Sequence, residues 1–441
     1  MIGAKFSRIF ISLLCSSLGS FANAEKLALA DIVRMGMKRS PLVKKAAADL
    51  NDAIATTAQY RGALFPNVYL DLSTQSNRNS QTFSNLSTGS NAGAYTQTNK
   101  AYLAATQPLF QSGGLTAGIE QRHVSEDIAV LAKLTADQTL VSNIVLAYYG
   151  YAQQNRLFLA AKDNFEILES YNKIINRFER IGRARTTDKL LSEINLVSAR
   201  AIVNNLDSQV SSQKEQLRQL LAVDELPEID LEGDSTLTKI DKISPSEAVA
   251  IALNANPDLL AAKKQINLIQ SSKDVDVSQD LPNLSLSGQL GFQSPDQPHL
   301  FDSSSQFGQV MLEFKAPLFS GLSSIYKRRS YEEKKVSASR NAELIQLSLE
   351  ANLRSQLKEL ESSFDRLQLT REAALKARNA LEIGNRDFQR SLISPQDILT
   401  LQTSRYNAEQ TFINTLFGYL NTLLKTRSLM GINLEASYAK K

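Results

Sequence analysis

The sequence predicts an α+β membrane protein that is internally duplicated, with long coiled-coil helices and four β-strands in each chain. Three observations predict this fold class. Prolines recur at a fixed spacing, two pairs of segments alternate apolar with polar residues, and two long stretches contain no proline. The chain has 441 residues, of which 21% are charged, which excludes a disordered chain and a helical membrane protein.

Residues 1–24 have the features of a signal peptide. Lys5 and Arg8 supply positive charge, an apolar run follows, and Ala22-Asn23-Ala24 offers small residues at a cleavage site. We expect the mature chain to begin at Glu25. Loss of the two cations lowers the formal net charge from +4 to +2, which is too balanced to indicate a nucleic-acid partner.

The single cysteine, Cys15, lies inside this segment after Leu14, whereas a lipidated cysteine would follow a small residue. The mature chain is therefore expected to have no disulfide and no thiol chemistry. No later run reaches about 18 apolar residues, so we expect no membrane-spanning helix.

Residues 25–223 and 244–433 are predicted to be two structural repeats, with a linker over 224–243 and a C-terminal tail over 434–441. Each repeat opens with a short amphipathic segment that ends before a proline, Leu29–Arg39 in the first and Ser246–Asn254 in the second. An Ala-, Lys- and Asp-rich helix then runs to a second proline. The two proline pairs, Pro41 with Pro257 and Pro66 with Pro282, are both separated by 216 residues.

After each second proline the apolar residues recur every two positions, which predicts β-strands. The apolar residues expected on the membrane face of these strands are Val68, Leu70, Leu72, Leu284, Leu286 and Leu290. Returning strands are expected at Lys100–Gln107 and Phe307–Lys315. About ten residues is the length of a membrane-spanning strand. A soluble hairpin is the alternative, and the flanking aromatics are few for an interface girdle.

Two stretches without proline, Leu115–Ile181 and Leu322–Ser394, predict long helices of about 100 Å at 1.5 Å per residue. Leu134, Val141 and Tyr148 recur every seven residues, as in a coiled coil. A second heptad row contains Leu131, Val145 and Leu159. The expected returning helices are Thr187–Leu221 and Pro395–Leu429.

Four strands per chain would leave unpaired edges in lipid, so closure of the sheet needs further chains. Three chains would supply twelve strands, enough for a barrel with an aqueous lumen.

Short motifs recur in matching order in the two repeats. The paired motifs are Ser40-Pro41 and Asn256-Pro257, Phe65-Pro66 and Leu281-Pro282, and Pro108–Gly113 and Pro317–Gly321. Further motifs that occur once are Ala136–Leu140, Ala147-Tyr148-Tyr149, Arg177-Phe178, Thr187-Asp188, Gln216–Leu220 and Asp397-Ile398-Leu399. In this order they resemble the TolC-like outer-membrane efflux and secretion ducts, over nearly the whole mature chain.

The resemblance implies a homotrimer in the outer membrane of a Gram-negative cell, with a twelve-stranded β-barrel in the lipid and an α-helical coiled-coil barrel in the periplasm. It also implies docking to a periplasmic adaptor and an inner-membrane transporter. Such a duct is passive and serves tripartite efflux or type I secretion.

By the same resemblance, the turn of the second repeat lies at a gated periplasmic entrance. Asp397 matches the position of an acidic ring, in which three carboxylates would favour cations and raise the carboxyl pKa. The alternative is a first-turn acid that the helix dipole favours. Thr400 stands where a second acid often occurs, and Ile393 where an entrance arginine can occur, which argues against a strong charge gate.

The expected adaptor-docking tips are Arg180, Ile181, Gly182, Arg183, Leu392 and Ile393. The first turn is basic, since Arg177 and Arg185 also flank it. The alternative is a solvated turn whose arginines lie near a helix C-terminus.

The sequence contains no motif for catalysis, a metal or a cofactor. The two histidines, His123 and His299, are far apart, and there is no P-loop, nucleophile elbow or dinucleotide fingerprint. We therefore expect a protein that is not an enzyme. The rival interpretation is a periplasmic coiled-coil adaptor or scaffold without a barrel, which does not account for two strand pairs of membrane length.

Overall fold

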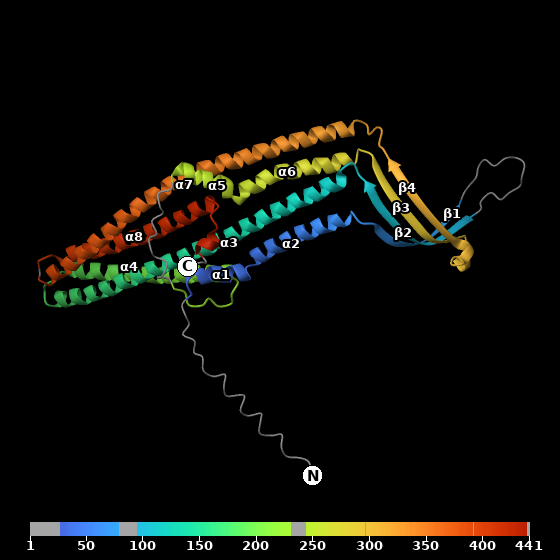
Figure 1. Cartoon of the computed structure of the whole chain (residues 1–441). Helices are drawn as coiled ribbons and strands as arrows, with labels where there is room; N and C mark the ends of the chain where they lie inside the picture. Colours follow the sequence, from blue (N-terminus) through green and yellow to red (C-terminus); the bar gives the residue numbers. More distant parts are fainter. Residues whose placement is uncertain (1–26, 79–94, 231–243, 296, 391, 439–441) are drawn as a thin grey trace, which may run out of the picture. The chain divides into compact units, whose positions relative to one another are not determined.

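The computed structural model describes residues 27–78, 95–230, 244–295, 297–390 and 392–438. The predicted signal peptide, the mature N-terminus and part of the predicted linker lie outside the described residues. An order of two helices, two strands and two helices occurs twice along the chain (Figure 1). The division into repeats with the predicted boundaries stays a prediction.

The first series comprises α1 (Leu29–Arg39), α2 (Pro41–Gly62), β1 (Asn67–Arg78), β2 (Tyr95–Phe110), α3 (Gly114–Arg180) and α4 (Thr186–Leu221). The second comprises α5 (Pro245–Ala255), α6 (Pro257–Ser278), β3 (Asn283–Ser294), β4 (Gln306–Lys315), α7 (Ser323–Gln389) and α8 (Pro395–Leu429). Two short 3-10 turns, η1 (Gln297–His299) and η2 (Ser303–Ser305), and the helix α9 (Leu434–Tyr438) are the other elements.

The prolines end the opening helices as predicted. Ser40 and Asn256 have ψ angles of 127° and 118°, because the residue before a proline is excluded from the helical region. Each still donates its N–H to the carbonyl oxygen four residues earlier. Pro41 and Pro257 then begin α2 and α6, where the missing N–H costs nothing.

The described parts of the chain divide into two compact units. The first contains the described parts of Met1–Lys44, Thr135–Asn256 and Leu349–Lys441. The second contains those of Lys45–Leu134 and Pro257–Ser348. Helices α3 and α7, of 67 residues each, contribute to both units.

The second unit contains an antiparallel sheet in the order β1-β2-β3-β4. The register places the six predicted strand residues on one face, together with apolar residues of β2 and β4. One row pairs Leu70 with Leu103 and Leu103 with Leu290. The other face is mostly polar. The four predicted strands are confirmed, and β2 is longer than expected.

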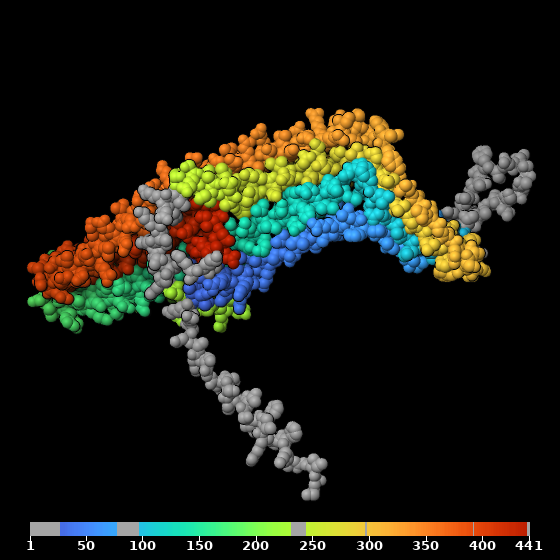
Figure 2. Space-filling view, viewed as in Figure 1, coloured from blue at the N-terminus to red at the C-terminus, as the bar shows by residue number. Residues whose placement is uncertain are grey.

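Helices α2, α3, α6 and α7 lie side by side in the second unit, in the same order as the strands that adjoin them (Figures 1 and 2). Arg61 and His123 join α2 to α3 at 2.7 Å. Lys264 and Asp127 join α6 to α3, also at 2.7 Å. The Lys327 ammonium of α7 donates to the carbonyl oxygen of Asp276 in α6 at 3.2 Å and lies 2.9 Å from Oδ2 of Asp280, just after the end of α6.

The core of the first unit is formed by α1, α3, α4, α7, α8 and α9. Val141 and Tyr148 of the predicted heptad row are buried in it, with 0% and 2% of their surface exposed. Leu159 of the second row is 53% exposed, which corrects its placement in a coiled-coil core. The heptad spacing of that row is therefore not matched by burial over its full length.

One described helix, α3, contains an 18-residue window whose mean hydropathy of 1.2 would allow a membrane span by length and composition alone. The core helix of a protein passes the same test. Val141, Ile144 and Val145 of α3 are fully buried in the first unit. Packing within the first unit therefore accounts for these three apolar residues of α3.

The predicted linker and the predicted C-terminal tail both contain buried residues. Ile229, in the predicted linker, is buried and forms an isolated parallel bridge with Leu27. Leu434 and Tyr438 of the predicted tail are buried in α9. Neither contact is predictable from the sequence, because each involves a few apolar residues within a polar stretch.

Candidate functional site

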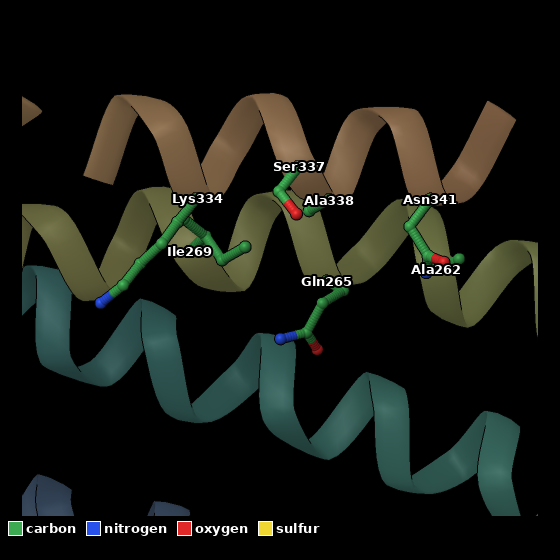
Figure 3. Close-up of a pocket in the computed structure, with 7 residues that line it drawn as sticks. All are labelled: Ala262, Gln265, Ile269, Lys334, Ser337, Ala338 and Asn341. Atoms are coloured by element: carbon green, nitrogen blue, oxygen red, sulfur yellow. The ribbon is translucent and has the colours of Figure 1, made fainter. Parts of the chain in front are cut away.

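The described residues contain no group of three or more His, Cys, Asp or Glu side chains that could hold a metal ion. A shallow groove lies between α6 and α7 (Figure 3). Its lining residues are Ala262, Gln265, Ile269, Lys334, Ser337, Ala338 and Asn341. These are mostly small or amide side chains, and they do not form a catalytic arrangement. The candidate functional surfaces are therefore the sheet and the turns at the helix ends.

The sheet has two unlike faces. Its apolar face is strongly exposed: Leu70, Leu290 and Val310 have 66%, 71% and 80% of their surface accessible. Tyr69, Asp71 and the residues paired with them lie on the other face. A face of this kind normally faces lipid or another apolar surface, because exposed apolar area on this scale is unfavourable in water.

Exposed aromatic residues lie at the junctions between strands and helices. They add to the few aromatic residues that flank the strands in the sequence. Phe65, Phe110 and Phe319 are exposed where β1, β2 and β4 meet their helices. Leu318, beside Phe319, is 96% exposed. An aromatic girdle at the membrane interface has this composition. The Leu-Phe residues of the motifs at the strand ends are the sequence signal for this girdle.

The turn between α3 and α4 is held by backbone hydrogen bonds. Gly182 has a φ of 73°, the left-handed conformation that commonly ends a helix. The N–H of Arg183 donates to the carbonyl oxygen of Phe178 at 2.8 Å. At the start of α4, the N–H of Arg185 donates to Oδ2 of Asp188 at 3.1 Å.

This turn exposes all of its predicted docking residues. Ile181 is 61% exposed, and Arg180 and Arg183 are exposed beside it, as are Arg177 and Arg185. Arg180 Nε donates to the carbonyl oxygen of Asn176 at 3.3 Å, near the C-terminus of α3. The geometry is compatible with a docking tip and equally with a solvated turn, so the docking role stays a prediction.

The turn before α8 is a capping box. The N–H and the hydroxyl of Ser394 donate to Oδ2 of Asp397 at 3.0 and 2.7 Å, and the N–H of Asp397 donates to Ser394 Oγ at 3.2 Å. These hydrogen bonds from Ser394 lower the pKa of the Asp397 carboxyl below its ordinary value. Within one chain the direction is therefore opposite to that expected for a ring of carboxylates.

The other predicted residues of this turn divide between core and surface. Leu392 is exposed, whereas Ile393 is half-buried and packs against a small apolar core near the helix ends. Thr400 is exposed, and its hydroxyl donates to the carbonyl oxygen of Gln396 at 3.0 Å. Ile393 thus packs against this core, in addition to the docking role predicted for it.

A cluster of aromatic residues joins the two hairpins near their turns. The ring of Phe388 lies 6.0 Å from Tyr171 and 6.1 Å from Phe178. The Tyr171 hydroxyl donates to the backbone carbonyl oxygen of Pro395 at 2.6 Å. Burial, and then the charge of Asp188, raises the pKa of Tyr171, so the hydroxyl stays a donor.

A sequence model of the outer membrane efflux protein family matches residues 34–223 and 248–431. Outer membrane protein TolC of Escherichia coli (strain K12) is 24% identical over 455 residues, covering 97% of this chain and 86% of that protein.

Two solved structures are also similar. The outer membrane protein VceC of Vibrio cholerae has a TM-score of 0.77 and 18% identity, covering 91% of this chain and 96% of that chain. The CmeC outer membrane channel of Campylobacter jejuni has a TM-score of 0.78 and 18% identity, covering 91% of this chain and 85% of that chain.

Proposed function

We propose, from the premise that this chain belongs to the outer membrane efflux protein family, that three copies of it form a passive exit duct. The family consists of outer-membrane channels, and this chain is an outer-membrane protein of that kind. In the proposed trimer, twelve strands form a barrel in the lipid and the long helices form a periplasmic tube.

The two-faced sheet with open edges is the observation that supports closure by further chains. Among the described residues, β1 pairs only with β2, and β4 pairs only with β3. Unpaired N–H and C=O groups at such edges are not tolerated in hydrocarbon. Because β1 and β4 run in opposite directions, β4 of one copy can pair with β1 of the next in an antiparallel ladder.

We further propose that the duct works with a periplasmic adaptor and an inner-membrane transporter, which supply substrate and energy. The adaptor would contact the tips formed by Arg180, Ile181, Gly182, Arg183, Leu392 and Ile393. Asp397 and Thr400 would line the periplasmic entrance. The similarity to TolC supports this arrangement, and efflux and type I secretion remain the two uses that such a duct can serve.

The test is assembly and conductance of the full mature chain. Purified protein should migrate as a heat-modifiable trimer and should fractionate with the outer membrane. It should also open discrete channels in planar bilayers. Recovery from the inner-membrane or soluble periplasmic fraction, without channel activity, would favour the adaptor or scaffold alternative.

A further inference from the structure

We propose that the polar face of the sheet contains a binding site for hydrophobic organic cations, formed by Asp71, Tyr102 and Phe307. The site rests on the proposed function, because this face becomes the wall of an aqueous lumen only when the sheet closes into a barrel.

One row of paired residues crosses all four strands. Asp71 in β1 pairs with Tyr102 in β2, Tyr102 pairs with Gly291 in β3, and Gly291 pairs with Phe307 in β4. Residues directly opposite each other in an antiparallel ladder project from the same face. The row is offset by one residue from the apolar rows, such as that of Leu70, so it lies on the polar face.

Gly291 allows the two aromatic rings of this row to meet. The rings of Tyr102 and Phe307 are 5.9 Å apart and inclined by 64°, an edge-to-face pair. A Cβ at Gly291 would lie 2.2 Å from the carbonyl oxygen of Ala101 and 2.5 Å from the Cβ of Tyr102. Any side chain there would displace the backbone of β2, so this position between the two aromatic residues requires glycine.

Asp71 places a negative charge beside these rings. Asp71 is the direct ladder partner of Tyr102, so its carboxylate lies next to the phenol ring on the same face of the sheet. The carboxylate oxygen Oδ1 is buried and has no hydrogen-bond partner among the described residues. Such an oxygen is unfavourable without a partner, and a bound cation would compensate its charge.

The combination of a carboxylate and aromatic rings selects one class of ligand. Aromatic faces attract cations through their quadrupole, and the same rings offer apolar contact area. Tyr69, two residues before Asp71 on the same face, adds a third ring that is 44% exposed. A small inorganic cation would use only the carboxylate, whereas an organic cation with apolar substituents would use all four side chains.

The experiment measures channel block by tetraphenylphosphonium chloride in planar bilayers, with the full mature chain. We expect block of the wild type. We expect Tyr102→Ala and Phe307→Leu each to raise the half-blocking concentration by roughly 2- to 30-fold, the range of a single cation–π contact. Asp71→Asn should weaken the block and lower the cation selectivity measured from the reversal potential.

Matched variants distinguish channel block at this site from block that has another cause. Gln289→Ala changes the neighbouring row on the same face, where Gln289 pairs with Ala104, and should leave the block unchanged. Phe307→Leu preserves an apolar side chain, so it tests the ring even if Tyr102→Ala does not assemble. Asp397→Asn tests whether the block arises at the entrance instead.

The outcomes distinguish this site from the proposed function. Channels that show no block, or equal block in the wild type, Asp71→Asn and Phe307→Leu, would overturn the site and leave the duct intact. Block that is lost only in Asp397→Asn would overturn it as well. A wild-type chain that opens no channels would overturn the proposed function on which the site rests.

Discussion

Asp397 shows how one residue can have two opposite electrostatic environments. In a single chain, the hydrogen bonds from Ser394 lower the pKa of the Asp397 carboxyl. Stability from this cap is present above the ordinary pKa of an aspartate and is lost as pH falls through the lowered value. A trimeric ring of carboxylates would raise the pKa instead, because like charges disfavour ionisation.

The two environments predict different effects of Asp397 on conductance and on block by cations. If Asp397 lines the entrance, Asp397→Ala should raise single-channel conductance or reduce block by multivalent cations in planar bilayers. The conductance of the wild type should then change with pH above about 4, the ordinary range of a carboxyl group. If Asp397 is only a cap, no change is expected between pH 5 and pH 8.

Asp188 supplies the matched control for this prediction. It caps α4 through the N–H of Arg185, as Asp397 caps α8 through Ser394. Asp188→Ala therefore removes a similar cap without removing the proposed entrance charge. Equal effects of the two substitutions, or no effect of Asp397→Ala on conductance and block, would reject the gate.

At the scale of the elements, the contact between the two hairpins depends on Tyr171. Its side chain is 5% exposed, and its hydroxyl holds the carbonyl oxygen of Pro395 at the first turn of α8. The ring also packs against Phe388 of α7. Tyr171 on α3 is thus a point at which both helices of the second hairpin are attached to the first.

Tyr171→Phe removes the hydroxyl and keeps the ring. We expect the first turn of α8 to open more readily, since one hydrogen bond contributes about 0.5–1.5 kcal/mol. Amide hydrogen exchange of the full chain measures this as exchange that is roughly 2- to 13-fold faster near 396–400, with the strands unchanged.

Tyr326→Phe is the control, because Tyr326 is 64% exposed on α7. Uniformly faster exchange, or no difference from the control, would contradict the proposed attachment.

At the scale of the whole molecule, the open edges of the sheet and the exposed turns both point to further chains as partners. The edge strands β1 and β4 can pair with a second copy of the chain. In our proposal, the basic turn around Arg183 binds a different protein. Four exposed arginines at one turn give a local positive charge that a partner with acidic or carbonyl groups would match.

A photoreactive residue at Arg183 should therefore cross-link a periplasmic adaptor in cells. The same residue at Arg371, on α7, is the control, because Arg371 is exposed but lies outside the predicted tip. Immunodetection and mass spectrometry identify the captured chain. Capture of no periplasmic protein from position 183, or equal capture from both positions, would count against the docking role.

Helix ends and strand faces were predictable from the sequence because they depend on local properties. Pro41 and Pro257 interrupt helices through their own covalent geometry. Val68, Leu70 and Leu72 share a face because successive side chains of a strand alternate.

Burial was less predictable. Leu159 follows the heptad spacing and is nevertheless exposed, and the predicted tail is docked through Leu434. Whether an apolar residue is buried depends on which other elements cover it, and periodicity along one helix does not contain that information.

The sequence by itself determined the order of elements, the two-faced strands and the resemblance to a family of outer-membrane ducts. Only the tertiary structure decided which distant residues meet. Asp71, Tyr102 and Phe307 lie on three strands, and no local pattern places them in one row. Strand register depends on pairing between segments far apart in the chain, so the proposed lumen site could be found only in the folded sheet.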